Sequence, residues 1–594
     1  MRILLVALNA KYVHTNLALR YLREGVVAVY PDVLLREFSI NERIEQIAGE
    51  IYEAKADVVG FSCYIWNITE TIAVIRHLHP VVPEVRFVLG GPEVSFEVEE
   101  FIRQNPEVDA LVVGEGERTF LQLLQTWQNS GDLSQVLGIA FRTNNGEVIV
   151  NPPQVNPLDL NTLPFPYAQN EDFTGRLVYV ETTRGCPFNC QYCLSSTFQG
   201  VRFLEPERFR QMFRHLLSNG ARTIKFVDRT FNANKRHALR ILDIVREESE
   251  QLPEARQVRV HCEMAGDLLD EEWMDYFRNY PPGLIQLEIG VQSTHQPTLE
   301  IVSRPQNFRA WKKYIPDIQA LGIPLHLDLI AGLPLESWTI FRNSFNDVYE
   351  VEADMLQLGF LKVLKGSGLR GQSTNYSLVF TPDPPYTILA TPVLSHCEIL
   401  QLQRMEDILD KYYNSGKFRH ALSVALELFL TPFDFYHEFA EYWQQCGWFQ
   451  RKWQGKALFE KLWEFLEVAH VQMAKEIVAL REEIRDAMRY DYYLWERPNS
   501  VPDWLEVSSE TEGKSELWKT KQETIRRDDY WETVVSEYQK MDRRQWSRNT
   551  AVAYFTSDVL HITESKTPCW YLFHYQQGKV KAYKYKGNAS KGVQ

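Results

Sequence analysis

The sequence contains little cysteine and no apolar run long enough to cross a membrane. Of its eight cysteines in 594 residues, five are scattered without any pairing rhythm: Cys63, Cys262, Cys397, Cys446 and Cys569. This usage argues against a disulfide-stapled fold and favours a reducing compartment. The opening run Met1–Leu8 is short and has no small-residue cleavage site. We therefore expect a cytoplasmic protein without a membrane segment or a membrane partner.

The sequence also has no excess of positive charge. Its formal net charge is −14. A general surface for nucleic acid or anionic lipid is therefore not expected, although a local basic groove is compatible with this balance. We expect no nucleic-acid partner. The length suggests three or four domains, and 45% hydrophobic residues allow each domain a sizeable core.

The remaining three cysteines form one compact motif. Cys186, Cys190 and Cys193 have CxxxCxxC spacing and follow an apolar strand at residues 177–181. Three thiolates on one loop can hold three corners of a cubane iron–sulfur cluster, which leaves the fourth iron open for a substrate or cosubstrate. The alternative is a structural zinc site. Zinc prefers a closed set of four ligands, and no fourth cysteine or histidine lies near this loop in the sequence.

This motif resembles the signature of the radical S-adenosylmethionine (SAM) superfamily, including the aromatic Tyr192 before the third cysteine. The resemblance implies a 4Fe–4S cluster held by the three cysteines, with SAM chelated at the open iron. One electron then cleaves SAM to methionine and a 5′-deoxyadenosyl radical. It also implies an electron donor such as flavodoxin or ferredoxin. The protein's own part would be orientation and exclusion of water.

Residues 1–140 alternate short apolar runs with amphipathic stretches. The runs cover residues 3–8, 33–38, 58–62, 87–91 and 110–114. This alternation predicts a parallel sheet with helices on both faces, in which ligands lie beyond the carboxyl ends of the strands. Distinctive residues follow the third, fourth and fifth runs: Ser62, Tyr64, Trp66 and Asn67, then Gly90, Gly91 and Pro92, then Gly114, Glu115, Gly116 and Glu117.

These loops, placed before the cysteine motif, make residues 1–140 similar to the Rossmann-like cobalamin-binding domain of many radical SAM proteins. The alternative is a flavodoxin-like fold that binds a nucleotide or nothing. No Asp-x-His-x-x-Gly motif is present, so we expect no protein histidine on cobalt. Tyr64, Trp66 and Asn67 are placed where a loop could face the lower side of the corrin. The alternative for Tyr64 and Trp66 is that their rings pack against the next helix.

Strand–helix alternation resumes after a proline-containing linker at residues 141–176. Strands are expected at 177–183, 223–228, 257–264, 284–291, 324–331 and 355–363. Six such units resemble the partial (β/α)6 barrel of the superfamily, here residues 177–370, with chemistry at the carboxyl ends of its strands. Cys262 alternates with Glu263 along its strand and is expected in the core.

The resemblance also implies SAM contacts at the ends of these strands. Arg304 suits the SAM carboxylate because a guanidinium matches that geometry, and the segment around Asp328 and Ile330 corresponds to the adenine-binding segment. The alternative for Glu263, Arg304 and Asp328 is an ordinary ion pair across strand ends. The full implied set is Phe226, Asp228, Glu263, Glu288, Gln292, Arg304, Asp328 and Ile330.

Residues 371–594 have mainly helical periodicity and a small terminal hairpin pattern. They resemble an uncharacterised helical domain that follows the barrel in one subgroup of cobalamin-type radical SAM proteins. The expected function is cobalamin-dependent methyl transfer to an unactivated carbon of a small-molecule or peptide substrate. The alternatives are a rearrangement, oxidation or cyclisation without methylation, and a non-catalytic cofactor-binding or sensor protein.

Overall fold

The structure is a computed structural model in which the chain forms two compact units, Met1–Ile399 and Leu400–Gln594. The described residues are all of 1–594 except 144, 168–170, 198–199, 254–256, 473–477, 496, 498–500, 506–515, 529, 536–540, 562–567, 577–578 and 587–594.

The first unit begins with a seven-stranded sheet of order β2-β1-β3-β4-β5-β6-β7, in which the first five strands are parallel. All seven residues of β1 are buried, as expected for a strand covered on both faces. Helices α2, α3 and α4 pack on one face and α1 and α5 on the other. The bounds are β1 Ile3–Asn9, β2 Leu34–Ser39, β3 Val58–Ser62, β4 Arg86–Gly90, β5 Ala110–Val112, α1 Leu17–Val26, α2 Ile44–Glu53, α3 Ile68–Leu78, α4 Val98–Gln104 and α5 Gly116–Gln128.

The last two strands of this sheet differ from the predicted connector. Strands β6 (Ile139–Arg142) and β7 (Val148–Val150) form an antiparallel hairpin that extends the sheet beyond β5. Gly146 in its turn has φ +80°, a conformation that glycine adopts at little cost. The predicted linker therefore begins with two strands. Two very short strands at a sheet edge leave little periodicity in the sequence.

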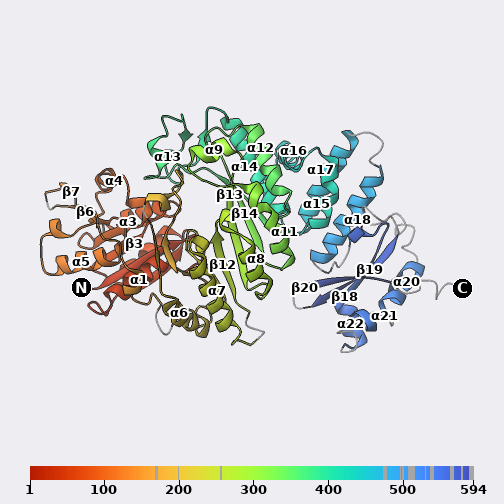
Figure 1. The fold of residues 1–594 in the computed structure, drawn as a ribbon, viewed down its shortest axis with the longest axis horizontal. Helices are drawn as coiled ribbons and strands as arrows, with labels where there is room; N and C mark the ends of the chain where they lie inside the picture. The colour runs from red at the N-terminus through yellow and green to blue at the C-terminus, as the bar shows by residue number, and fades with distance from the viewer. Residues whose placement is uncertain are drawn as a thin grey trace. The chain divides into compact units, whose positions relative to one another are not determined.

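The second sheet is parallel, with order β15-β14-β13-β12-β11-β8. Because β8 and β15 are its two edges, the sheet is a partial barrel, and the predicted six-stranded fold class is confirmed. Helices α6, α7, α8 and α12 cover its outer face (Figure 1). The bounds are β8 Leu177–Val180, β11 Thr223–Phe226, β12 Arg259–Met264, β13 Ile285–Gln292, β14 Leu325–Ala331, β15 Met355–Phe360, α6 Pro206–Ser218, α7 Lys235–Ser249, α8 Glu271–Arg278 and α12 Trp338–Tyr349.

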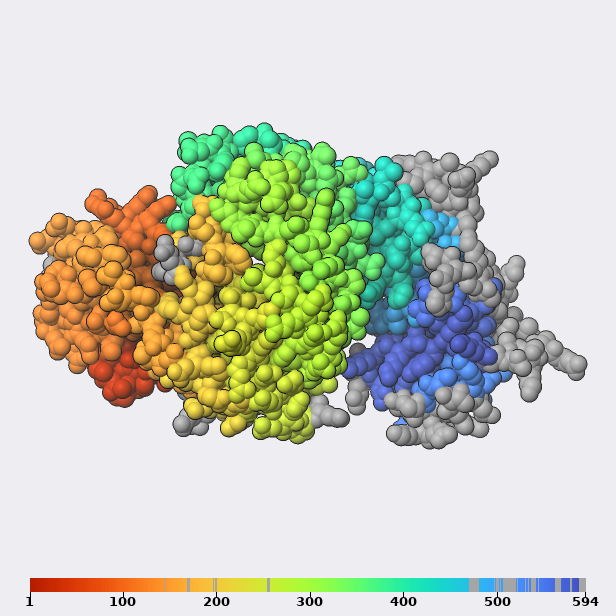
Figure 2. Space-filling view, viewed as in Figure 1, coloured from red at the N-terminus to blue at the C-terminus, as the bar shows by residue number. Residues whose placement is uncertain are grey.

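Burial alternates along the barrel strands. In β13, residues in odd positions are buried under the outer helices and residues in even positions are only partly buried. The same period places Cys262, which is buried, opposite Glu263 on β12. The interior face of the barrel therefore carries its polar side chains. In Figure 2, the surface of the N-terminal domain, in red and orange, adjoins that of the barrel, in yellow and green.

Shorter elements complete the first unit. Strands β9 and β10 pair as a two-stranded antiparallel sheet, with β9 before the cysteine motif and β10 after it. Strands β16 and β17 pair after the barrel. The bounds are β9 Thr183–Gly185, β10 Val201–Phe203, α9 Gln296–Ile301, α10 Phe308–Trp311, α11 Ile315–Ala320, α13 Gly368–Gly371, β16 Val379–Phe380 and β17 Ile388–Ala390.

The second unit is mainly helical and ends in a three-stranded antiparallel sheet, β18-β19-β20. Its core is rich in aromatic rings, with Tyr412, Phe439 and Trp443 in mutual contact. No helix among the described residues is long and apolar enough to span a bilayer. The bounds are α14 His396–Tyr412, α15 Arg419–Ala425, α16 Pro432–Gln445, α17 Lys456–Gln472, α18 Val478–Trp495, α20 Glu516–Arg526, α21 Tyr530–Val534, α22 Arg543–Asn549, β18 Thr550–Phe555, β19 Cys569–Gln576 and β20 Lys579–Lys584.

Candidate functional site

The cysteine motif lies on a loop that begins where β9 ends. Cys186, Cys190 and Cys193 all carry free thiols. Cys186 Sγ lies 3.3 Å from the hydroxyl of Thr230, and the backbone N–H of Ser195 donates to Cys193 Sγ at 3.4 Å. Before the first cysteine, Gly185 has φ +105°, and a Cβ there would meet the carbonyl oxygen of Gly200 at 2.2 Å. Only glycine therefore fits the turn that starts the loop.

The loop is fastened to two other parts of the barrel. Gln191 donates its N–H to Val302 O at 2.9 Å and accepts from the N–H of Leu369 at 2.8 Å. Arg304 places Nη1 3.7 Å from Cys190 Sγ and donates through Nη2 to Gly290 O at 2.5 Å. These contacts hold the loop against the end of α9, against α13 and against β13.

The thiols have the composition that a cubane cluster with one open iron requires. No other cysteine occurs between residues 64 and 261, so the loop offers three thiolates and no fourth. Burial raises the pKa of Cys190 overall, and the neighbouring Arg304 guanidinium opposes part of this rise. A cation beside the sulfur favours the thiolate form that binds iron. The donor set fits an iron–sulfur cluster that leaves one iron for a cosubstrate.

A cavity of about 670 Å³ lies between the carboxyl ends of the two sheets, and we call it the main cavity. From the N-terminal sheet it is lined by nine of the predicted cobalamin contacts. These are Ser62, Tyr64, Trp66, Gly90, Gly91, Gly114, Glu115, Gly116 and Glu117. A neighbouring cavity of about 270 Å³ shares part of this wall, includes Pro92 and extends to Leu194 and Ser195 just after the cysteine motif. The structure thus brings the strand-end loops and the cysteine loop to adjoining spaces.

Specific contacts shape the loops that form the N-terminal wall of the main cavity. Tyr64 and Trp66 stack with ring centroids 4.3 Å apart and an interplanar angle of 7°, and Trp66 is 48% exposed. Asn67 is buried and does not line the cavity, because its side chain donates to Leu8 O and Ser62 O. At Gly91, with φ +111°, a Cβ would lie 2.6 Å from Cys63 O. The backbone therefore closes tightly behind the cavity wall.

The two predicted glutamates in the fifth loop are held by arginines of the barrel side. Glu115 accepts from both terminal nitrogens of Arg202, one at 3.0 Å, and lies 3.4 Å from Arg184. Arg184 also pairs with Glu117 at 2.8 Å and with Glu181 at 2.6 Å. Burial would raise the pKa of Glu115, but the hydrogen bonds from Arg202 and the charge of Arg184 lower it. These ion pairs join the N-terminal sheet to the start of the barrel.

A second junction involves the loop after β1. His14 Nδ1 lies 2.6 Å from the hydroxyl of Tyr179, and Leu177 donates its N–H to Val13 O at 2.8 Å. Both His14 and Tyr179 line the main cavity. Sequence analysis did not select them, since neither stands in a recognisable motif.

The barrel side of the main cavity contains one of the predicted SAM contacts, Glu263. Its partner Lys225, 3.4 Å away, lines the cavity as well, as does Arg229. Phe226 is fully buried, and the buried carboxylate of Asp228 accepts from the N–H and hydroxyl of Thr182. The period of 2 along β11, which puts Lys225 and Val227 on the cavity side, was the signal that could have identified Lys225.

The other predicted SAM contacts lie on β13, β14 or the segment after β13. Gln292 closes β13 with φ +66°, and Arg304 follows it beside the cysteine loop. Ile330 lies near the end of β14. Glu288 and Asp328 lie earlier on their strands and are not among the lining residues of the main cavity.

Glu288 belongs instead to a group of charged side chains inside the barrel. Its Oε2 lies 3.0 Å from Lys225 Nζ and 2.7 Å from His261 Nε2. Burial would raise the pKa of Glu288, but the hydrogen bonds and charges of His261 and Lys225 lower it to about 2. The carboxylate therefore stays ionised across the physiological range.

Family comparisons match three parts of the chain. Residues 3–124 match the B12 binding domain and residues 180–348 match the Radical SAM superfamily. The chain joins a B12 binding domain to a radical SAM domain. The predicted pairing is confirmed, and the predicted cofactors are those of these two domains. Residues 374–573 match a protein of unknown function, DUF4080.

Several relatives each match about half of this chain. The cobalamin-dependent radical SAM methyltransferase TokK of Streptomyces tokunonensis is 28% identical over 325 residues, which is 52% of this chain and 46% of that protein. The anaerobic magnesium-protoporphyrin IX monomethyl ester cyclase of Rubrivivax gelatinosus is 24% identical, over 56% of this chain and 61% of that protein. The chain spans about half the length of the curated relatives it matches.

Solved structures agree with the fold. The cobalamin-dependent S-adenosylmethionine radical enzyme OxsB, with aqua-cobalamin and S-adenosylmethionine bound, superposes with a TM-score of 0.56 at 16% identity over 83% of this chain and 78% of its own. The radical S-adenosylmethionine methyltransferase TsrM of Kitasatospora setae has a TM-score of 0.53 at 16% identity, over 64% and 76% of the two chains. At these identities the likeness concerns the fold alone.

Proposed function

We propose that the protein is a cobalamin-dependent radical SAM enzyme that transfers a methyl group to an unactivated carbon of a small-molecule or peptide substrate. The main cavity carries this proposal, because its wall comes from the carboxyl ends of both sheets. A corrin seated on the N-terminal loops would thus face the barrel mouth. Methyl transfer needs that proximity, since orientation of reactants contributes roughly 7–11 kcal/mol in favourable cases.

Each part of the chain has a distinct role in this proposal. Cys186, Cys190 and Cys193 hold the cluster, and the partly buried Arg304 keeps the loop in place beside β13. Gly90, Gly91, Gly114 and Gly116 let the backbone approach the corrin closely. When bound, the cluster supplies the electron that cleaves SAM, and cobalamin carries the methyl group. The protein orients both and excludes water.

The stacked pair of Tyr64 and Trp66 is proposed to face the lower side of the corrin. Both rings line the main cavity, and the half-exposed indole of Trp66 leaves a flat surface toward it. Contact of this kind is apolar and gives cobalt no protein ligand. Glu263, Gln292, Arg304 and Ile330 remain the proposed SAM contacts, with Tyr192 next to the cluster.

A second function is compatible with the same cavity. One set of relatives is named as cyclases rather than methyltransferases, which favours cyclisation or another non-methylating reaction as the runner-up. The two functions use the same domains and are distinguished by whether the labelled methyl group passes from the sulfur of SAM to cobalamin. A sensor without catalysis is disfavoured because a binding protein has no need of an open iron site.

The test uses the anaerobically reconstituted full chain with hydroxocobalamin, dithionite and SAM labelled in its methyl group. Methyl transfer predicts that label enters cobalamin and that 5′-deoxyadenosine forms. If 5′-deoxyadenosine forms and cobalamin gains no label, the methyltransferase proposal is wrong and the runner-up replaces it. If neither appears, both catalytic proposals fail.

The cellular setting is part of the same proposal. All eight cysteines are free thiols, which supports a cytoplasmic location where thiols stay reduced. Flavodoxin or ferredoxin is proposed as the electron donor in place of dithionite. Reduction of the cluster by either protein, measured as 5′-deoxyadenosine formed without dithionite, tests this point.

A further inference from the structure

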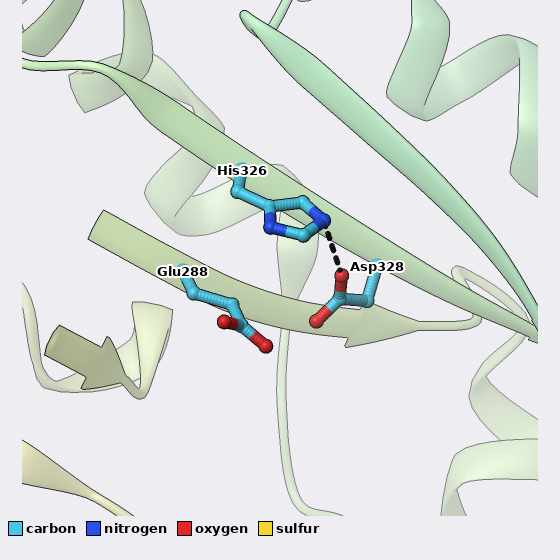
Figure 3. A group of neighbouring side chains, drawn as sticks. All are labelled: Glu288, His326 and Asp328. Atoms are coloured by element: carbon cyan, nitrogen blue, oxygen red, sulfur yellow. Dashed lines mark ion pairs between the residues drawn. The ribbon is translucent and has the colours of Figure 1, made fainter. Parts of the chain in front are cut away.

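Three side chains on neighbouring strands of the barrel form a group that the proposed chemistry does not use. Glu288 lies on β13, and His326 and Asp328 lie on β14 (Figure 3). One ligand atom from each lies within 4.8 Å of the other two. We call these three residues the barrel triad. They project from paired strands, Glu288 being directly opposite His326 in the register, so the backbone holds them firmly.

Two members of the triad, His326 and Asp328, form a close ion pair. His326 Nε2 and Asp328 Oδ1 lie 3.0 Å apart, as the dashed line in Figure 3 marks. Apart from this contact with each other, the two atoms have no partner among the described residues, although both are inaccessible to solvent and His326 is only 7% exposed. Both donor atoms are therefore buried, held close together and free of any competing partner.

The spacing of this pair is also the spacing of two ligands on one metal ion. Two ligands at right angles, each about 2.1 Å from an ion, lie about 3.0 Å apart. This is the separation of His326 Nε2 and Asp328 Oδ1. The third donor, Glu288, uses Oε2 for Lys225 and His261, so its carboxylate can still offer Oε1. One imidazole and two carboxylates form a donor set for divalent first-row ions.

We propose that the barrel triad binds one divalent transition-metal ion, separate from the iron–sulfur cluster. Three protein ligands leave positions open for water or for an oxygen of a bound molecule. Lys225, which contacts Glu288, also lines the main cavity. An ion held by the triad is therefore separated from the main cavity by one side chain, Lys225.

The position of Lys225 predicts in which direction its removal changes the metal affinity of the triad. Its ammonium group lies 3.0 Å from Glu288 Oε2 and 3.4 Å from Glu263. A fixed positive charge this close repels a cation, while the two carboxylates of the triad attract it. Lys225→Met is therefore expected to tighten metal binding, the opposite of what a purely structural ion-pair network predicts.

The experiment is a Mn²⁺ titration of the full chain in metal-free buffer, with free Mn²⁺ measured by electron paramagnetic resonance. Mn²⁺ is the probe because it prefers oxygen and nitrogen donors over thiolates, so the cysteine loop does not compete. The wild type is expected to bind one Mn²⁺ per chain. His326→Gln and Asp328→Asn are each expected to weaken binding by about tenfold or more, and Lys225→Met to strengthen it.

His420→Gln is the matched control. His420 Nδ1 lies 2.7 Å from the buried Asp491, so this variant removes an equally close imidazole–carboxylate pair that has no third donor. Among the described residues, no third carboxylate, imidazole or thiol completes a metal-binding group with this pair, so the variant is expected to bind Mn²⁺ as the wild type does. The proposal is overturned if the wild type binds no Mn²⁺, or if His326→Gln and Asp328→Asn, shown folded by circular dichroism, bind it unchanged. These outcomes do not depend on SAM cleavage, so they are separate from a failure of the proposed function.

Discussion

Arg304 connects the cysteine loop to the edge of strand β13. Its Nη1 lies 3.7 Å from Cys190 Sγ, although the two residues are 114 positions apart, and its Nη2 donates to Gly290 O. Arg304 is partly buried, and these two contacts fix the position of its guanidinium. A cation is thereby fixed next to a sulfur that is proposed to ligate iron, and it also stands beside Gln292, the last residue of β13.

Replacing Cys186, Cys190 and Cys193 with alanine is expected to abolish iron binding, because no fourth cysteine adjoins the loop in the sequence. Iron content, visible absorbance and 5′-deoxyadenosine formation are the measurements. Cys397→Ala and Cys446→Ala, which remove exposed thiols, are the controls. Both should retain the iron, the visible absorbance and 5′-deoxyadenosine formation. Retention of iron by the triple variant, or zinc in place of iron in the wild type, contradicts the assignment.

Cobalt is expected to carry no protein nitrogen on its lower side. His14 is the one histidine among the described residues that line the main cavity, and its Nδ1 is occupied by the Tyr179 hydroxyl. The Co(II) state of the cobalamin-loaded protein should therefore give electron paramagnetic resonance spectra without histidine nitrogen splitting. His14→Ala should leave the spectrum unchanged, and a change would identify His14 as the ligand.

Glu336 predicts a pH dependence of stability. It is fully buried and accepts a hydrogen bond from Ser293, and burial raises its pKa to about 8. The folded state therefore holds a proton that the unfolded state releases above its own pKa of about 4.3. Between these values, rising pH lowers the free energy of unfolding by about 1.4 kcal/mol per pH unit, and the loss stops above the folded pKa.

Glu336→Gln removes this slope because the amide does not titrate. Denaturant midpoints at several pH values between 5 and 8 should show the variant gaining stability relative to the wild type as pH rises. Glu84→Gln, at an exposed position, is the matched control and should run parallel to the wild type. A difference between Glu336→Gln and the wild type that stays constant with pH would show that Glu336 is ionised in the folded protein.

The ion pair of Glu115 and Arg202 is expected to stabilise the junction of the two domains. In a double-mutant cycle with Glu115→Gln and Arg202→Met, we expect a coupling free energy of about 0.5–3 kcal/mol, because both side chains are mostly buried. The exposed pair Glu99 and Arg103 is the control and should couple by about 0.3–0.5 kcal/mol. Equal couplings in the two cycles would mean that solvent screens the junction.

Most of the strand order could be predicted because it depends on local pattern. All six barrel strands and the five parallel strands of the first sheet have apolar runs at the predicted places. Strands β6 and β7 were missed, since their pairing is set by the edge of β5 rather than by their own short sequences. The position of the loops at one edge of each sheet also followed from parallel topology.

The sequence by itself determined the cysteine loop, the two domain types and the residues that follow each strand. These depend on neighbours along the chain and on the period of 2 in a strand. Only the tertiary structure decided which strand-end side chains face the main cavity and which are engaged elsewhere. It paired Glu115 with Arg202 and Asp228 with Thr182, and it brought Glu288 to His326 and Asp328. These partners are distant in sequence, and charge complementarity between them acts only after packing has brought them together.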